Sequence, residues 1–168
     1  MRLNDKTKGK LSRMLEKARP MMEARKKVRM QQKRGKYVSR NEKYCFVRLN
    51  MVLHDTYPEM EVTENDVDIL PGWEIDIVVR GPQEWIMAIE WDGAYHRKPI
   101  YGEAKLRMRK GQDEYKNKAL HSKKCVLVRV KDDGSYNPKF VDGKVEKIME
   151  IIDDLVMADV KAYGKIEI

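Results

Sequence analysis

The chain has 168 residues, 37% of them charged, and a formal net charge of +8 at pH 7. This length suits one domain with a real core, and no apolar stretch approaches the roughly 18 residues of a membrane-spanning helix. Cys45 and Cys125 stand alone inside apolar runs, as core residues in a reducing compartment do. We therefore expect a soluble cytoplasmic protein without a membrane partner.

Positive charge is concentrated at the N-terminus. Residues 1–40 carry fifteen Lys/Arg against three Asp/Glu, whereas the rest of the chain carries 20 basic and 24 acidic residues. The pattern predicts a basic helical arm over residues 1–38, divided at Pro20, ahead of a core over residues 39–168. Such an arm is typical of nucleic-acid binding, and a solvated tail is the alternative. The residues expected to hold phosphates are Arg25, Lys26, Lys27, Arg29, Lys33, Arg34 and Lys36.

The core opens with a predicted helix over about residues 40–54. Ser39 to Glu42 reads as a capping box, and the apolar positions that follow share one helix face. Glu42 lies three residues before Cys45 and hence on the same, inward face. Glu42 is therefore a candidate catalytic residue, and its alternative role is only to close the capping box.

A β-hairpin is predicted next, from apolar runs at residues 73–79 and 85–91 joined by a five-residue turn. A short strand is expected before it, at residues 61–63. Beyond it, residues 93–102 form a loop of basic and aromatic character, which leads into a predicted helix over residues 103–122.

Two further elements complete the core. Residues 125–130 are almost continuously apolar, which predicts a buried central strand parallel to the second hairpin strand. An amphipathic helix is expected over residues 141–161. The alternation of elements predicts an α/β fold with a mixed central sheet flanked by helices.

The hairpin carries two acidic candidates, Asp76 and Glu90. If the turn centres on Pro82, Asp76 lies opposite Ala88 and one diagonal step, roughly 7–8 Å, from Glu90. Strand alternation places both carboxylates on one half-buried face with nothing cationic between them. A shared divalent cation would stabilise this arrangement, so we predict that Asp76 and Glu90 bind metal. The alternatives are a solvent-facing Asp76 on an edge strand and a Glu90 paired with Lys or Arg.

Three further polar residues converge on the same region: Asp92, His96 and Asp113. Asp92 precedes Gly93 and could be only a turn residue; His96 could be structural; Asp113 could pair with Lys116 three residues later. An acidic cluster that holds a metal, with a histidine or lysine nearby, is what phosphodiester hydrolysis needs. Arg97, Lys98 and Lys105 are expected to hold phosphates near the scissile bond.

At these residues the sequence resembles a known group, the very-short-patch-repair-like branch of the PD-(D/E)XK, or restriction-endonuclease-like, superfamily. The resemblance covers about residues 39–131. It rests on Glu42, on Leu70-Pro71-Gly72 ahead of Asp76, on Glu90-Trp91-Asp92-Gly93 with His96, and on Asp113 to Lys118 before an apolar strand. The order is also similar to phage homing endonucleases whose motif reads Glu, Asp, His, Asp.

The chain departs from this pattern at one informative position. The superfamily has Lys two residues after the strand carboxylate, and this chain has Asp92 there. His96 or a helix residue such as Lys116 would have to replace that lysine.

The resemblance implies a restriction-endonuclease-like core and Mg²⁺-dependent cleavage of DNA, with Mn²⁺ as a substitute and no small-molecule cofactor. Glu42, Asp76, Glu90, Asp92, His96, Asp113 and Lys116 are the expected catalytic residues. The alternatives are a DNA junction or mismatch repair nuclease of the same fold, a toxin-like RNase, and a catalytically silent nucleic-acid-binding protein. Double-strand cleavage would require a homodimer or two successive nicks.

Overall fold

The core is built on one five-stranded mixed sheet. The computed structural model describes residues 39–132, 134–157 and 164–168, so the basic arm predicted over residues 1–38 lies outside the described residues. The strands run in the spatial order β1-β2-β3-β4-β5. The first three pair antiparallel, and β3, β4 and β5 pair parallel. The strand bounds are β1 Glu61–Asp66, β2 Ile75–Arg80, β3 Ile86–Asp92, β4 Cys125–Lys131 and β5 Lys165–Glu167.

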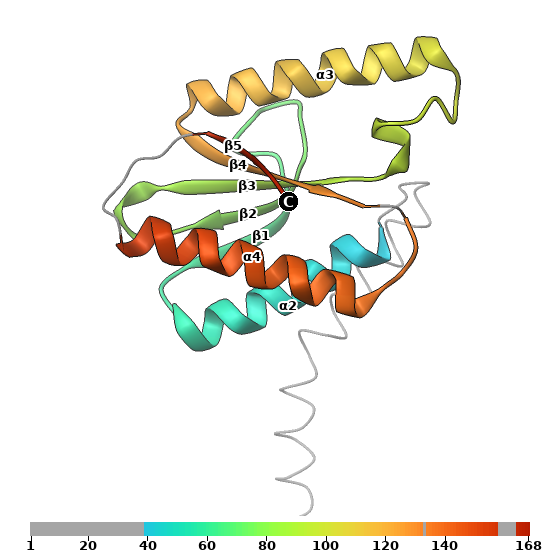
Figure 1. The fold of residues 1–168 in the computed structure, drawn as a ribbon. Helices are drawn as coiled ribbons and strands as arrows, with labels where there is room; N and C mark the ends of the chain where they lie inside the picture. The colour runs from blue at the N-terminus through green and yellow to red at the C-terminus, as the bar shows by residue number, and fades with distance from the viewer. Residues whose placement is uncertain (1–38, 133, 158–163) are drawn as a thin grey trace, which may run out of the picture. The chain divides into compact units, whose positions relative to one another are not determined.

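Helices cover both faces of the sheet, as Figure 1 shows. Helices α2 (Arg40–Thr56) and α4 (Pro138–Met157) lie on one face, and α3 (Glu103–Ser122) lies on the other. The larger apolar core lies under α2 and α4, where Leu49 and Ile148 pack with Ile89 of the sheet. The smaller core lies under α3, where Leu120 packs with Val78 and Ala88. The predicted α/β fold with a mixed, helix-flanked sheet is confirmed.

Most predicted elements agree with the structure. The helix predicted over residues 103–122 has those bounds, and the strand predicted at residues 125–130 is parallel to β3. The short strand expected at residues 61–63 extends to Asp66, and α4 begins earlier than predicted, at Pro138. The last residues of the predicted helix over 141–161 lie outside the described part of the chain. Strand β5 was not predicted, because three residues carry too little pattern to indicate a strand.

The hairpin register was predicted wrongly, and the reason is local. Residues Pro82–Glu84 form a short 3₁₀ turn in which Glu84 takes a positive φ of 62°. The Trp85 carbonyl accepts a hydrogen bond from the Gly81 N–H at 3.1 Å, so the closing pair is Gly81 and Trp85. The turn therefore centres one residue later than Pro82, and Ala88 faces Val78 instead of Asp76. Two residues further along the hairpin from the Val78–Ala88 pair, the same register places Asp76 opposite Glu90.

Candidate active site

The carboxylates of Asp76 and Glu90 lie on the sheet face that α3 covers. Asp76 lies two residues before Val78, and Glu90 lies two residues after Ala88. Their side chains therefore project from the same face of the sheet as Val78 and Ala88, which pack under α3. Asp76 Oδ2 accepts a hydrogen bond from the backbone N–H of Trp91 at 2.7 Å, which ties β2 to the end of β3. Glu90 is buried, with 5% of its surface exposed. The prediction that the two side chains share a face is confirmed, and they are closer neighbours than the predicted diagonal pair.

A lysine from α3 contacts Glu90, so the expectation that nothing cationic lies at this pair was wrong. Lys116 Nζ is 2.6 Å from Glu90 Oε1 and 2.7 Å from Oε2. Only the contact with Oε2 has hydrogen-bond geometry. Among the described residues, Oε1 therefore remains buried without a hydrogen bond. The alternative of a Glu90 paired with Lys or Arg is therefore what the structure has, and the partner is Lys116, the helix residue expected to replace the strand lysine.

Glu42 completes what we call the acid cluster, Glu42, Asp76 and Glu90. It lies in the first turn of α2, whose residues Cys45, Leu49 and Leu53 are buried as predicted. The capping box is formed only in part: the Glu42 carboxylate interacts with the backbone N–H of Ser39, whereas the Ser39 hydroxyl donates to Asp132 at 3.4 Å. The partly buried Glu42 carboxylate thus lies close enough to Asp76 and Glu90 for their charges to act on it.

The acid cluster has too little positive charge for three ionised carboxylates. Burial, followed by repulsion from Asp76 and Glu90, raises the pKa of Glu42 to about 8. Burial and the charge of Asp76 also raise the pKa of Glu90, although Lys116 and Arg129 oppose the shift. Burial raises the pKa of Asp76 as well. The site therefore favours uptake of protons or of a cation.

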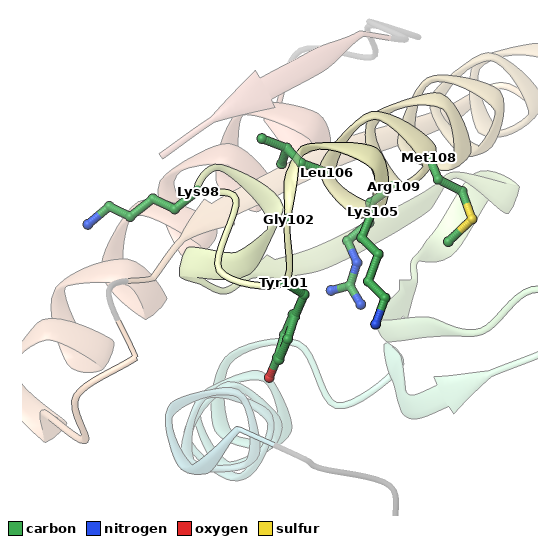
Figure 2. A pocket seen from close by; sticks show the side chains of 7 residues that line it. All are labelled: Lys98, Tyr101, Gly102, Lys105, Leu106, Met108 and Arg109. Atoms are coloured by element: carbon green, nitrogen blue, oxygen red, sulfur yellow. The ribbon is translucent and has the colours of Figure 1, made fainter.

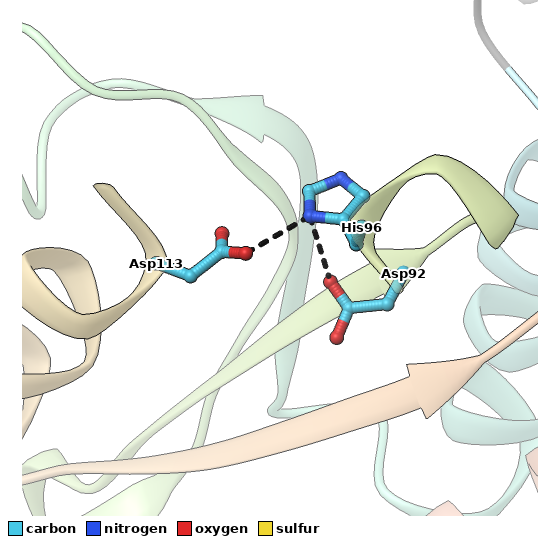
Figure 3. A group of neighbouring side chains, drawn as sticks. All are labelled: Asp92, His96 and Asp113. Atoms are coloured by element: carbon cyan, nitrogen blue, oxygen red, sulfur yellow. Dashed lines mark hydrogen bonds and ion pairs between the residues drawn. The ribbon is translucent and has the colours of Figure 1, made fainter. Parts of the chain in front are cut away.

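A second group lies beside the acid cluster: Asp92, His96 and Asp113, which we call the Asp–His–Asp group. His96 Nδ1 lies 3.0 Å from Asp113 Oδ2 and 3.6 Å from Asp92 Oδ1 (Figure 3). The other ring nitrogen lies on the side of the ring away from both carboxylates (Figure 3). His96 is positioned by the loop after β3, which contains a 3₁₀ turn at Ala94–His96, and Asp113 by α3. The charges of Asp92 and His96 act on Asp76, so the two groups are neighbours.

Arg129 of β4 neutralises the Asp–His–Asp group. Its guanidinium contacts both carboxylate oxygens of Asp92, with Nε 2.6 Å from Oδ2, and its Nη2 lies 3.2 Å from Asp113 Oδ1. Although burial alone would raise it, the hydrogen bond with His96 and the charge of Arg129 hold the pKa of Asp113 below its usual value. The alternative that Asp113 pairs with Lys116 is not what the structure has, since Lys116 pairs with Glu90.

Geometry and charge point to different places for a metal. Within the described ranges, the group of three acidic or histidine side chains whose ligand atoms lie within 4.8 Å of one another is Asp92, His96 and Asp113. A divalent cation there would meet the guanidinium of Arg129, which already satisfies Asp92. The acid cluster has the opposite balance, with three acids and one lysine in ion-pair contact with Glu90. An unpaired negative charge attracts a cation, whereas a carboxylate already paired with a guanidinium does not. The balance of charge therefore favours the acid cluster as the metal site.

Asp132 holds the ends of three elements together, and it is not among the site residues that the sequence predicts. It is 3% exposed. Its carboxylate accepts hydrogen bonds from Asn41 Nδ2 at 3.1 Å and from Trp91 Nε1 at 2.6 Å. The start of α2, which carries Glu42, is thereby fixed to the end of β3, which carries Glu90. The available signal for Arg129 was a single charge inside an apolar strand; for Asp132 there was none.

The expected phosphate-binding residues divide between two roles. Arg97 donates to the backbone carbonyls of Asp92 at 3.3 Å and Asp132 at 3.0 Å, so it ties the loop to the sheet ends. Lys98 and Lys105 are exposed and lie on the loop before α3 and on its first turn. The basic residues of the predicted arm lie outside the described residues. None of the described helices is long and apolar enough to cross a membrane.

Replacing Arg129 tests the second group. Arg129→Met leaves Asp92 and Asp113 beside each other without their guanidinium, so we expect the free energy of unfolding to fall by about 3–5 kcal/mol in denaturant titrations. Lys131→Met, which removes an exposed ion pair with Glu167, is the matched control and should cost about 1 kcal/mol or less. Equal losses in both variants would show that Arg129 does not hold this group together.

The pH dependence of stability tests the acid cluster. Because the folded-state pKa of Glu42, about 8, lies above the ordinary value of 4.5, protonation favours the folded state. Without divalent ions, the melting temperature should therefore fall as the pH rises from 5 to 8. Glu42→Gln should flatten this slope, whereas Glu146→Gln, on the exposed surface of α4, should keep it. A wild-type melting temperature that rises over this interval would contradict the assignment.

Comparison of the chain with protein-family models, with curated proteins and with solved structures gives no match. The function is therefore inferred from the two groups of side chains and their surroundings.

Proposed function

We propose that the chain is a metal-dependent DNA endonuclease that hydrolyses phosphodiester bonds. The observation that carries the proposal is the acid cluster, in which burial raises the pKa of Glu42, Asp76 and Glu90. Buried carboxylates that repel one another destabilise the fold. Without a bound cation, this loss of stability would remain uncompensated. A bound divalent cation offsets that cost and supplies the electrostatic stabilisation that phosphodiester cleavage requires.

The fold supports the same proposal. A mixed sheet in which Asp76 and Glu90 lie on adjacent strands, with Glu42 on a helix over the other face, agrees with what the resemblance in the order of motifs leads us to expect. Fold similarity alone would not identify an activity. Together with the acid cluster, it favours DNA cleavage over other uses of the arrangement.

Mg²⁺, for which Mn²⁺ can substitute, fits the donors of the acid cluster. Magnesium prefers carboxylate oxygens, and the acid cluster supplies these from Asp76, Glu90 and Glu42. Asp76 and Glu90 would hold the ion, and Glu42 would act through a water or a second ion. When bound, the ion neutralises phosphate charge and lowers the pKa of an attacking water.

Lys116 supplies the ammonium that the strand position of Asp92 lacks. It reaches Glu90 from α3 instead of from the strand itself. Placed against a metal-binding carboxylate, the ammonium can orient the attacking water and stabilise negative charge on the phosphate. Asp92, paired with Arg129, then serves mainly to fix the end of β3.

His96 and Asp113 form the proton-transfer pair. Asp113 accepts from His96 Nδ1, which fixes the orientation of the ring. The opposite nitrogen, Nε2, would exchange a proton with the attacking water or the leaving oxygen. Homing-type cleavage and junction or mismatch repair would share this chemistry and differ in the DNA that is bound.

The Lys116–Glu90 ion pair favours one alternative from a different class. In this alternative the lysine replaces the metal permanently, and the protein is a nucleic-acid-binding factor without catalytic activity. The basic arm alone would then account for the affinity. Metal-dependent cleavage distinguishes the two.

The nicking of supercoiled plasmid tests the proposal. Wild-type protein should nick with Mg²⁺ or Mn²⁺ and not with EDTA. Asp76→Asn, which keeps the shape of the side chain and removes its charge, should lower the rate by at least about 10²-fold while DNA binding persists. Asp68→Asn, an exposed aspartate ahead of β2, should retain wild-type activity. Nicking that survives Asp76→Asn would refute the site, and binding without cleavage of any duplex, junction, mismatch or RNA substrate would favour the alternative.

The salt dependence of DNA binding tests the arm. If the arm neutralises about six phosphates, affinity should fall roughly 10³-fold or more between 50 and 200 mM salt. Deletion of residues 1–36 should flatten the plot of log affinity against log salt concentration. A slope that the deletion leaves unchanged would mean that the arm does not contact DNA.

A further inference from the structure

A shallow hollow beside the first turns of α3 combines an aromatic ring with cations. It is lined by Lys98, Tyr101, Gly102, Lys105, Leu106, Met108 and Arg109, so its lining includes three basic residues and no acidic one. Tyr101, Lys105 and Arg109 extend to the same side, whereas Lys98 extends the other way (Figure 2). Lys105 Nζ lies 5.6 Å from the centre of the Tyr101 ring. Negative charge is thus favoured beside an aromatic face.

The Tyr101 ring is presented to solvent and is not used by the core. Tyr101 is 65% exposed and Met108 is 60% exposed, whereas Leu106 between them is buried. Large exposed apolar side chains next to cations are typical of a surface that receives a ligand with a flat apolar part and an anionic part. A nucleotide has both parts.

The size of the hollow decides how a nucleotide would lie. Its volume of about 50 Å³ is too small to enclose a nucleobase, so a base would stack on the open face of Tyr101 with its phosphate against Lys105. A base inside an intact duplex is stacked on both sides and cannot offer a face to the ring. The ligand is therefore an unpaired nucleotide, because only an unstacked base can lie on an aromatic side chain.

The position of the hollow relates it to the proposed cleavage. Lys105 precedes Asp113 by eight residues in the same helix, a rise of about 12 Å, which corresponds to a few nucleotides along one strand. His96 lies five residues before Tyr101 in the connecting loop. A strand that passes the acid cluster can therefore continue over Tyr101.

We propose that Tyr101 and Lys105 bind an unpaired nucleotide a few positions from the scissile phosphate, so that the preferred substrate is DNA at a boundary between duplex and single strand. This inference deepens the proposed function and rests on it for the identity of the substrate. The stacking itself is independent of catalysis, and it is measured without divalent ions.

The test compares two fluorescent DNA probes of the same sequence, a blunt duplex and a duplex with a short single-stranded extension that carries 2-aminopurine. Full-length Tyr101→Leu should bind the extended probe about 5- to 150-fold more weakly than wild type and the blunt duplex equally well. Tyr101→Phe, which keeps the ring, should retain the preference. Tyr136→Leu, which replaces a tyrosine that is also exposed, should behave as wild type. Lys105→Met should also weaken binding of the extended probe more than of the blunt duplex, since it removes the contact with the phosphate of the unpaired nucleotide.

Stacking is read independently from the fluorescence of 2-aminopurine, which should be quenched by wild type and by Tyr101→Phe but not by Tyr101→Leu. Equal binding of the extended probe by Tyr101→Leu and wild type, or equal losses on both probes, would overturn the inference. If this test fails, metal-dependent nicking can still be observed. If nicking is absent, a preference for the extended probe can still be measured. The two proposals can therefore be refuted separately.

Discussion

Three carboxylates that share one ammonium are the constraint on which the rest of the site depends. The helices on either side of the sheet bury Glu42, Asp76 and Glu90. Lys116 compensates only part of their negative charge. Buried charges without partners are costly, so a fold retains them only where a bound cation or a proton can complete the balance. The raised pKa values of Glu42, Asp76 and Glu90 follow from this deficit of positive charge.

The topology explains why residues so distant in sequence meet at this place. Strands β3 and β4 are parallel, so α3 must cross back over the sheet between them, and its inner face brings Asp113 and Lys116 above the end of β3. Arg129, next to Glu90 in the parallel register, then binds Asp92 and Asp113 from the sheet. One crossover thus builds both groups. Arg129 forms its ion pairs in the Asp–His–Asp group, and its charge only partly offsets the excess of carboxylates in the acid cluster.

The helices and strands were predictable because they follow periodic patterns in the sequence. The features that could not be predicted depend on turn conformation and on partners distant in the sequence. Helix α3 and strand β4 follow from hydrophobic periodicity, and the shared face of Asp76 and Glu90 follows from strand alternation. The predicted hairpin register was wrong because it depends on the backbone conformation of the turn. Glu84 takes a positive φ there, which a glutamate in the sequence does not indicate. The sequence leaves the partner of Glu90 open as Lys or Arg for a different reason. Local spacing favours a pair between Lys116 and Asp113, and only tertiary packing brings Lys116 to Glu90.

Calorimetric titration of the metal-free protein with Mn²⁺ at pH 7, repeated in buffers of different ionisation enthalpy, tests the central claim most directly. Because the pKa of Glu42 is about 8, a cation that enters the acid cluster must displace a proton. We expect saturable binding with release of protons from the acid cluster, lost in Asp76→Asn. Absence of binding at millimolar Mn²⁺, or binding that Asp76→Asn leaves unchanged, would contradict the account.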